Sequence, residues 1–162
     1  MYFNPLISRS TTMQKLVRVD PAEVANIISK LPFFKQFTAA ERQLVCDQYS
    51  QFLLFSKEEA IITEGNTDRT MYILLLGSVD VTTNFRSQVI TSLKPGEFFG
   101  EMSFISGHNR TTDVIASSDK VIVLRVDESM MFSLTAGTRE KIKDRILLQL
   151  VNRLEQMNHL FY

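Results

Sequence analysis

The chain has 162 residues, with 18 basic and 18 acidic side chains and no formal net charge. A length near 150 residues fits a single domain, and a neutral chain has no overall attraction to nucleic acid. The single cysteine excludes an internal disulfide. One cysteine and two histidines are too few ligands for a zinc site or an iron–sulfur cluster. The longest apolar runs, about five residues, are too short to cross a membrane. We therefore expect a cytoplasmic protein that contacts neither nucleic acid nor membrane directly.

Residues 1–20 are weakly patterned and are expected to form a flexible N-terminal arm. Helices are predicted over residues 21–48. The pair Asp20-Pro21 places an acceptor and a proline where a helix starts. Thr38, with Glu41 three residues later, predicts a capping box at the start of a second helix.

Short strands are predicted over residues 50–126. Runs rich in β-branched and aromatic residues alternate there with turn residues, a pattern typical of a small sandwich or barrel. Every residue from 71 to 76 is apolar, which predicts a strand buried on both faces. The expected strands are 52–55, 60–63, 71–76, 78–83, 88–93, 113–116 and 121–126.

The helical period returns over residues 127–158, so that helices flank the strands in an α+β domain. Asp127 is expected to start a helix, Gly137 to break it, and a long helix to follow to about Met157. Basic residues of this helix, Arg153 among them, lie mostly off its apolar stripe and are expected to face solvent. The stripe has two interpretations: packing onto the strands of the same chain, or pairing with another chain as a homodimer. It comprises Ile142, Ile146, Leu147, Leu150, Val151, Leu154 and Met157.

The stretch from residue 98 to 112 carries the most chemistry. Gly100 lets the backbone approach a ligand closely, and residues 101–106 can form only one or two helical turns, whose free N–H groups suit one phosphate. Arg110, nine positions after Glu101, can return to the same place and pair with a phosphate oxygen. Because an ionised carboxylate only accepts hydrogen bonds, Glu101 suits a sugar hydroxyl. Together these features indicate a sugar phosphate.

This stretch resembles the phosphate-binding cassette of cyclic nucleotide-binding domains, the family of protein kinase regulatory subunits, cyclic-nucleotide-gated channels and the bacterial catabolite activator. Phe99, Gly100, Glu101 and Arg110 match the cassette and its spacing. The resemblance covers about residues 24–154. It implies an eight-stranded β-roll, a jelly-roll-like barrel, over residues 50–126, flanked by N-terminal helices and a C-terminal helical lid, in one domain of residues 21–162. Further matches are Leu31-Pro32-Phe33-Phe34, Glu64-Gly65, Met71-Tyr72-Ile73, Gly77-Ser78-Val79 and Lys94-Pro95-Gly96-Glu97-Phe98.

The resemblance also implies a role for each matched residue. Glu101 accepts a hydrogen bond from the ribose 2′-hydroxyl of a cyclic nucleotide, and Arg110 pairs with the cyclic phosphate. Neither a metal nor a cofactor beyond this ligand is expected. The remaining ligand-binding residues, mostly through backbone N–H groups, are Gly100, Met102, Ser103, Thr111 and Thr112.

Two positions depart from the cassette. Asn109 replaces the usual proline before the arginine, and Thr111-Thr112 replaces the common pair of alanines. A threonine after the arginine is often linked with cGMP in the family, but bacterial cAMP binders carry a hydroxyl there too. Thr111 therefore does not settle the base, and family frequency favours cAMP over cGMP.

Two functions follow from these observations. The first is a cyclic nucleotide sensor that repositions its C-terminal helix to signal to a downstream protein partner. The second is a degenerate fold that serves as a scaffold or dimerisation module without nucleotide. An enzyme is not expected, because no catalytic triad spacing, triphosphate-binding loop or metal cluster is present in the sequence. The simplest structural alternative is that Glu101 and Arg110 form a local ion pair with each other.

Overall fold

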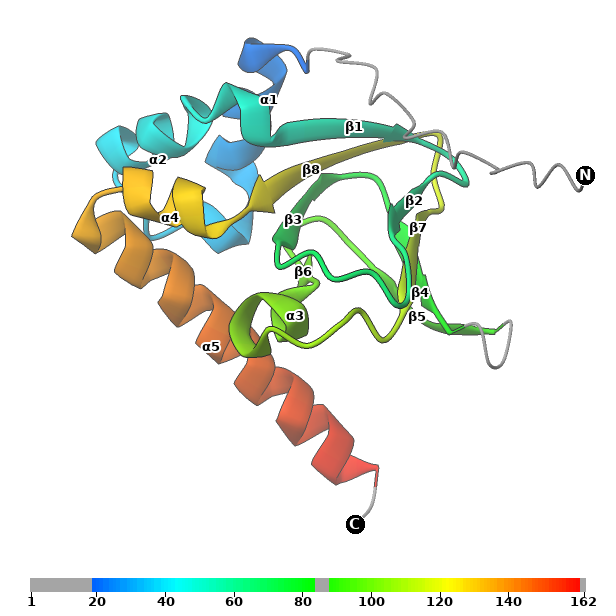
Figure 1. Cartoon of the computed structure of the whole chain (residues 1–162). Coiled ribbons are helices and arrows are strands. Elements are labelled where there is room, and N and C mark those ends of the chain that lie inside the picture. The colour runs from blue at the N-terminus through cyan, green and yellow to red at the C-terminus, as the bar shows by residue number, and fades with distance from the viewer. Residues whose placement is uncertain (1–18, 84–87, 161–162) are drawn as a thin grey trace, which may run out of the picture.

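The computed structural model describes residues 19–83 and 88–160 (Figure 1). The arm expected over residues 1–20 lies outside these ranges except for its last two residues. The helices are α1 (Pro21–Lys30), α2 (Ala39–Cys46), α3 (Glu101–Ser106), α4 (Glu128–Ser133) and α5 (Ala136–His159). All of them except α3 come before or after the strands in the chain and lie to one side of them in space, which confirms the predicted α+β class.

Side-chain caps fix where the first two helices begin. Asp20 Oδ1 accepts a hydrogen bond from the Ala22 N–H at 3.0 Å, at the start of α1. At the start of α2 the Thr38 hydroxyl accepts from the Glu41 N–H at 3.1 Å, and Glu41 Oε1 accepts from the Thr38 N–H at 3.2 Å. This is the predicted capping box, in which two otherwise unpaired N–H groups are satisfied.

Among the residues that the structure describes, eight antiparallel strands form two four-stranded sheets, with the orders β1-β8-β3-β6 and β2-β7-β4-β5. All seven strands predicted from the sequence are present, and the eighth, β6, has only two residues, too few to give a periodic signal. Within the described residues the two sheets share no strand, so the jelly-roll-like roll is not a closed barrel. The bounds are β1 (Phe52–Ser56), β2 (Ala60–Ile62), β3 (Met71–Leu76), β4 (Val79–Thr82), β5 (Val89–Leu93), β6 (Phe98–Phe99), β7 (Asp113–Ala116) and β8 (Lys120–Val126).

The two faces of β3 belong to different hydrophobic cores, because alternate residues of a strand point to opposite faces. Ile73 and Leu75 pack in a core with the helices. Tyr72 and Leu74 pack in a second core, which draws its residues from both sheets. Both faces of β3 are therefore buried, as its unbroken apolar run predicts.

The break between the last two helices differs from the prediction. Gly137 does not end a helix but lies in the first turn of α5. The break falls at Leu134 and Thr135, where the Thr135 hydroxyl accepts from the Thr138 N–H at 3.3 Å. A threonine N-cap contributes about 1 kcal/mol, which offsets the similar cost of a glycine in a helix, so α5 can begin before Gly137.

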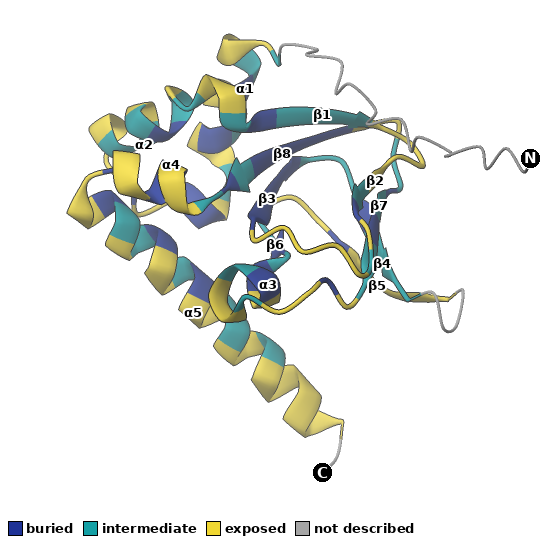
Figure 2. Ribbon diagram, viewed as in Figure 1, coloured by how far each residue is buried: buried dark blue, intermediate teal, exposed yellow. Residues whose placement is uncertain are grey.

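Helix α5 crosses the domain diagonally and extends beyond the strands, and its distal half is largely exposed (Figure 2). Ile142 and Ile146 are buried in the core with α1 and β3, and Ile146 is the last buried residue of the helix. In the described ranges, no helix combines the length and the apolar character needed to cross a membrane.

Candidate functional site

A cavity of about 630 Å³ lies between α3, the sheet that contains β4 and β5, and the distal part of α5. Its volume falls in the range of about 300–1,000 Å³ that is typical of small-molecule sites. The strands contribute apolar side chains to one wall, and α3 with the loop that follows it contributes polar ones. The structure brings together all seven residues singled out from the sequence as lining of this cavity: Gly100, Glu101, Met102, Ser103, Arg110, Thr111 and Thr112.

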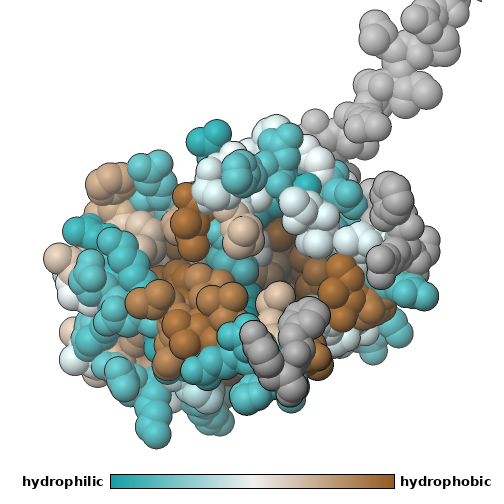
Figure 3. Space-filling view, turned by 90° about the horizontal axis from the view of Figure 1, so that it is seen from below, coloured by the Kyte–Doolittle hydropathy of each residue, from teal (hydrophilic) through white to brown (hydrophobic). Residues whose placement is uncertain are grey.

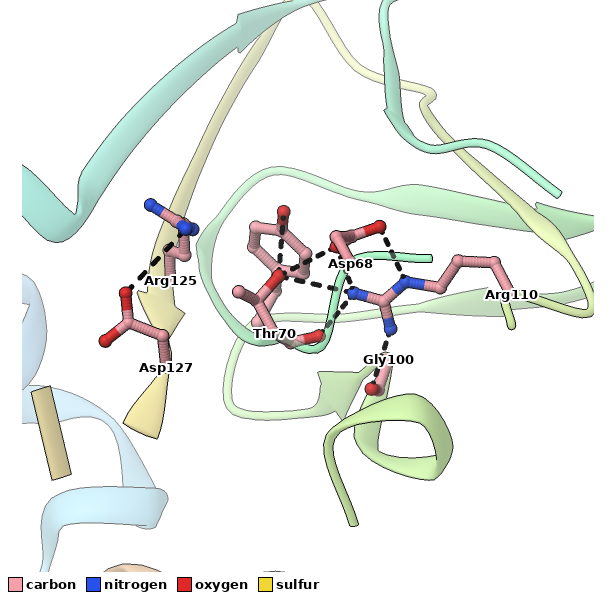
Figure 4. Close-up of polar contacts among 7 residues, drawn as sticks. Asp68, Thr70, Gly100, Arg110, Arg125 and Asp127 are labelled. Atoms are coloured by element: carbon pink, nitrogen blue, oxygen red, sulfur yellow. Dashed lines mark hydrogen bonds and ion pairs between the residues drawn. The ribbon is translucent and has the colours of Figure 1, made fainter. Parts of the chain in front are cut away.

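Arg110 is a buried cation in the cavity wall, with 4% of the residue exposed. Its Nε and Nη2 donate to the two carboxylate oxygens of Asp68 at 3.2 and 2.6 Å (Figure 4). Its Nη1 donates to the Gly100 carbonyl at 2.8 Å, and Nη2 also donates to the Thr70 carbonyl. The guanidinium is thus held in one orientation by groups on two separate segments of the chain, residues 68–70 and Gly100.

The hydrogen bonds of Arg110 leave one donor for an anion. A guanidinium has five N–H groups. Within the described residues, those on Nε and Nη2 are directed to Asp68 and Thr70, whereas Nη1 carries two N–H groups and has Gly100 as its partner. One N–H of Nη1 is therefore available on a side chain that lines the cavity. A phosphate oxygen is a strong, charge-assisted partner for such a donor.

The contact with Arg110 determines the charge of Asp68. Partial burial raises the pKa of this carboxyl, but the hydrogen bonds and positive charge of Arg110, with the Thr70 hydroxyl, outweigh it and hold the pKa below its usual 3.8. Asp68 is therefore ionised at neutral pH, and its negative charge offsets that of Arg110.

Gly100 makes this arrangement possible in two ways. Its φ of 77° is in the left-handed region that favours glycine. A Cβ at this position would lie 2.8 Å from Arg110 Nη1 and 3.1 Å from the Thr70 carbonyl oxygen. Glycine therefore allows the backbone to turn into α3 while its carbonyl touches the guanidinium.

Glu101 is the first residue of α3 and, although 91% buried, it does not pair with Arg110. Its Oε1 accepts from Arg153 Nη1 at 3.0 Å, across the gap to α5. Arg153 Nη2 donates to the Phe98 carbonyl at 2.7 Å, and the guanidinium carbon lies 4.8 Å from the centre of the Phe98 ring. The local ion pair between Glu101 and Arg110 is thus ruled out, because each has its own partner.

The rest of the cavity is largely apolar. Seen from below, hydrophobic side chains gather on the face formed around α3 and α5 (Figure 3). Leu93 and Val114 are buried in the strand wall, whereas Ile90, Met157 and Leu160 are exposed at the rim. Such a surface suits a flat organic ring beside the charged groups. Among the described residues, no three histidine, cysteine, aspartate or glutamate side chains are grouped to hold a metal ion.

Sequence reasoning missed three residues of this site. Arg153 was expected to face solvent, but its charged group lies against Glu101, 52 residues away in the sequence. Asp68 and Thr70 contact Arg110. The sequence hint for these two residues is only that an acid and a hydroxyl lie just before a buried strand. Nothing in the neighbouring sequence distinguishes Arg153 from the other basic residues of α5.

A two-sheet roll with a cavity of about 630 Å³ that combines charged and apolar walls is the architecture of a domain that binds a small ligand. The profile of the cyclic nucleotide-binding domain matches residues 52–137, more than half of the chain. The chain therefore belongs to the cyclic nucleotide-binding domain family. The matched stretch contains all eight strands, α3 and the beginning of α5.

Relatives with this domain include human cGMP-dependent protein kinase 2, which is 36% identical over 93 residues, 55% of this chain and 12% of the kinase. The cAMP-dependent protein kinase regulatory subunit of Mycosarcoma maydis is 28% identical over 89 residues, 54% of this chain and 17% of that subunit. The chain thus spans a small part of the length of these relatives. A crystal structure of a cyclic nucleotide-binding domain from Methylobacillus flagellatus KT has the same fold, with a TM-score of 0.66, 24% identity and coverage of 84% of this chain and 79% of that one.

Proposed function

We propose that the chain is a cyclic nucleotide sensor, in which the nucleotide binds the cavity beside α3 and changes how α5 is docked. The observation that carries the proposal is a buried guanidinium, Arg110, and a buried carboxylate, Glu101, on one cavity, each held by a different partner. The cation suits the cyclic phosphate, and the acceptor suits the ribose 2′-hydroxyl. The role is binding rather than catalysis, and the cytoplasmic location expected from the sequence belongs to the same proposal.

The base is proposed to lie against the apolar part of the cavity. The ligands in the names of the relatives include both cAMP and cGMP, so they do not select one. We retain cAMP as the favoured ligand, from its frequency in the family. Thr111 is exposed and lines the cavity. Its hydroxyl can accept a hydrogen bond from a guanine amino group, so it is the residue that would favour cGMP over cAMP.

Calorimetric titration of the purified chain with cAMP and with cGMP tests the proposal. Arg110→Ala is expected to weaken binding at least tenfold, because one charge-assisted hydrogen bond is worth about 1.5–3 kcal/mol. Arg125→Ala is the matched control, because Arg125 is 40% exposed and pairs at 3.7 Å with Asp127, away from the cavity lining. Binding by Arg110→Ala that equals the wild type, in protein with an unchanged circular dichroism spectrum, would exclude the phosphate role.

The ribose contact has its own test. Glu101→Ala should bind cyclic nucleotide more weakly, and it should also discriminate less between the nucleotide and its 2′-deoxy analogue. The reason is that the analogue lacks the hydroxyl that the carboxylate accepts from. The ratio of the affinity for the nucleotide to the affinity for its 2′-deoxy analogue should therefore be smaller in Glu101→Ala than in the parent protein. If this ratio is the same in both proteins, the proposed ribose role is wrong.

One observation favours the second candidate, a scaffold that does not bind nucleotide. Arg110 and Glu101 are already paired with the protein groups Asp68 and Arg153, so both can stabilise the fold without a ligand. The same titration separates the two candidates. A well-folded wild-type chain that binds neither cAMP nor cGMP at millimolar concentration would support the scaffold.

We further propose that the outer face of α5 contacts a second copy of this chain and forms a homodimer. Leu147, Val151 and Leu154 recur at intervals of four and three residues on this helix and are all exposed. This spacing is that of a coiled-coil seam. Sedimentation equilibrium should give a dimer that Val151→Asp dissociates, and a wild-type chain that stays monomeric at 100 μM would contradict the homodimer.

A further inference from the structure

A second cavity, of about 320 Å³, lies between α5, the start of the short 3-10 helix η1 (Pro32–Phe34) and the turn between β5 and β6. Its volume is at the lower end of the range that is typical of small-molecule sites. The two cavities share part of one wall, which includes Glu97 and Arg153. Arg110 lines only the first cavity, whereas Arg145 lines only the second. The second cavity therefore has a cation of its own.

Arg145 is half-buried in this wall and has no hydrogen bond or ion pair with any described residue. Its guanidinium carbon lies 5.8 Å from the centre of the Phe33 ring, which covers one face of the group. The Nε atom is buried without a partner. The two Nη atoms also have no protein partner but are not buried, so their N–H groups remain available to an acceptor in the cavity.

Every other arginine that is buried or half-buried in the described ranges has an acceptor in the protein. Such an acceptor replaces the hydration that a guanidinium loses when it is taken partly out of water. Arg145 is the exception, because neither a carboxylate nor a carbonyl group compensates its charge. The arginines that do have protein acceptors are Arg42, Arg110, Arg125, Arg139 and Arg153.

Gln149 adds a second unpaired donor to the same wall. It lies one helical turn after Arg145, so the two side chains are neighbours on one face of α5. Gln149 also lines the cavity, and its Nε2 is buried without a hydrogen-bond partner. The lining includes apolar side chains beside these polar ones, among them Phe33, Pro95 and Leu148. The cavity thus combines unpaired N–H donors with an apolar surface.

The charges around the cavity favour a ligand with one negative charge. The charged residues of its lining are Glu97, Arg145 and Arg153. Arg153 is offset by Glu101, whose Oε1 lies 3.0 Å from Arg153 Nη1. One cation, Arg145, therefore remains beside one acid, Glu97, and no ion pair joins the two within the described residues. A monoanion can pair with the cation, whereas a dianion would meet stronger repulsion from the acid.

We propose that this second cavity binds a small molecule that carries one carboxylate on an apolar body. The carboxylate pairs with the Nη groups of Arg145, whose planar fork matches two oxygens. The Gln149 amide rotates to donate beside it, and the apolar body lies against Phe33, Pro95 and Leu148. The proposal goes beyond the nucleotide function and does not depend on it, because it concerns a different cavity and a different cation.

Sodium benzoate is the probe, because it presents one carboxylate on a small apolar ring. NMR titration of the chain without nucleotide should give saturable shifts of the Arg145 Nε–H signal, the Gln149 side-chain amide and the Gly96 backbone amide. Half-saturation is expected in the millimolar range that is usual for so small a ligand. No shift of these signals at about 50 mM benzoate would overturn the proposal. Shifts confined to residues 100–111 would place benzoate in the first cavity and would overturn it as well.

Two further probes separate the charge from the apolar body. Benzamide has the same ring without the negative charge, and inorganic phosphate, supplied as the dianion, has charge without the ring. Each should bind at least about tenfold more weakly than benzoate, because each lacks one of the two contacts. Benzamide that binds as tightly as benzoate would show that the pairing with Arg145 contributes nothing. Phosphate that binds as tightly would show the same of the apolar walls, and either result would overturn the proposal.

Substitution of Arg145 tests the assignment of the cation. Arg145→Gln should weaken benzoate binding at least about tenfold, because the charge-assisted contact is lost. Arg145→Lys keeps the charge without the planar fork and should lose less. Lys143→Gln is the matched control, because Lys143 lies on the same helix, does not line the cavity and pairs with Glu140 at 3.5 Å. If Arg145→Gln with an unchanged circular dichroism spectrum binds benzoate like the wild type, the proposal is wrong.

Discussion

Replacement of Arg110 by alanine is expected to destabilise the fold even without a ligand. The side chain is almost fully buried and donates to the carboxylate of Asp68 and to the carbonyls of Thr70 and Gly100. Alanine removes the Arg110 donor from all three, but the Gly100 carbonyl still accepts from the Phe104 N–H at 3.4 Å and Asp68 Oδ2 still accepts from the Thr70 hydroxyl at 3.0 Å. Thr70 is itself 6% exposed, so its carbonyl depends on a protein partner more than on bulk water.

The magnitude follows from the number and burial of these contacts. A buried acceptor left unsatisfied costs about 1–3 kcal/mol. Asp68 is 43% exposed, so water replaces much of its pairing with Arg110. Water that enters from the cavity also reaches Gly100, which leaves Thr70 as the largest loss. The expected decrease in the free energy of unfolding is about 2–4 kcal/mol.

Urea unfolding followed by circular dichroism measures this decrease. With a slope of about 1–3 kcal/mol per molar urea, the midpoint of Arg110→Ala should fall by about 1–2 M. In Arg125→Ala, which removes a half-exposed arginine and a 3.7 Å ion pair, the midpoint should move by less than about 0.5 M. Equal midpoints for the wild type and Arg110→Ala would refute the view that these contacts stabilise the fold.

Three further predictions concern stability. Gly100→Ala should lower the urea midpoint more than Gly96→Ala does. Both glycines have a positive φ, which costs alanine about 1–2 kcal/mol. Of the two, only Gly100 would place the new Cβ against Arg110. Equal losses would mean that Arg110 moves aside freely. Ile142→Ala should cost about 2–5 kcal/mol by the same assay, because this fully buried residue fills the core under α5, and a loss below about 1 kcal/mol would contradict that packing. Finally, the pKa of Asp68 is lower in the folded than in the unfolded chain, so its contribution is present above about pH 4 and is lost as the pH falls through the folded pKa. The difference in unfolding free energy between the wild type and Arg110→Ala should therefore narrow as the pH falls below about 4 in urea titrations, and a constant difference would count against the pairing.

The sequence was sufficient for most of the elements whose signal is local. The caps at Asp20 and Thr38 and the apolar runs of the strands depend on residues close together in the chain, and the structure contains them as predicted. The segment from Gly100 to Arg110 lies within eleven residues, so its glycine turn and short helix could also be anticipated. Strand β6 could not, because two residues have no period, and the start of α5 was missed because the N-cap at Thr135 offsets the cost of Gly137.

The partners of the two charged residues were decided by the tertiary structure alone. Arg110 meets Asp68 across 42 positions of sequence, and Glu101 meets Arg153 across 52. The sequence around a charged residue does not indicate which residue it will pair with. The energy of an ion pair depends on distance and burial, and both are set by how the sheets and α5 pack. The sequence thus predicts by itself which groups form the candidate site, whereas only the assembled fold determines which protein groups hold them in place.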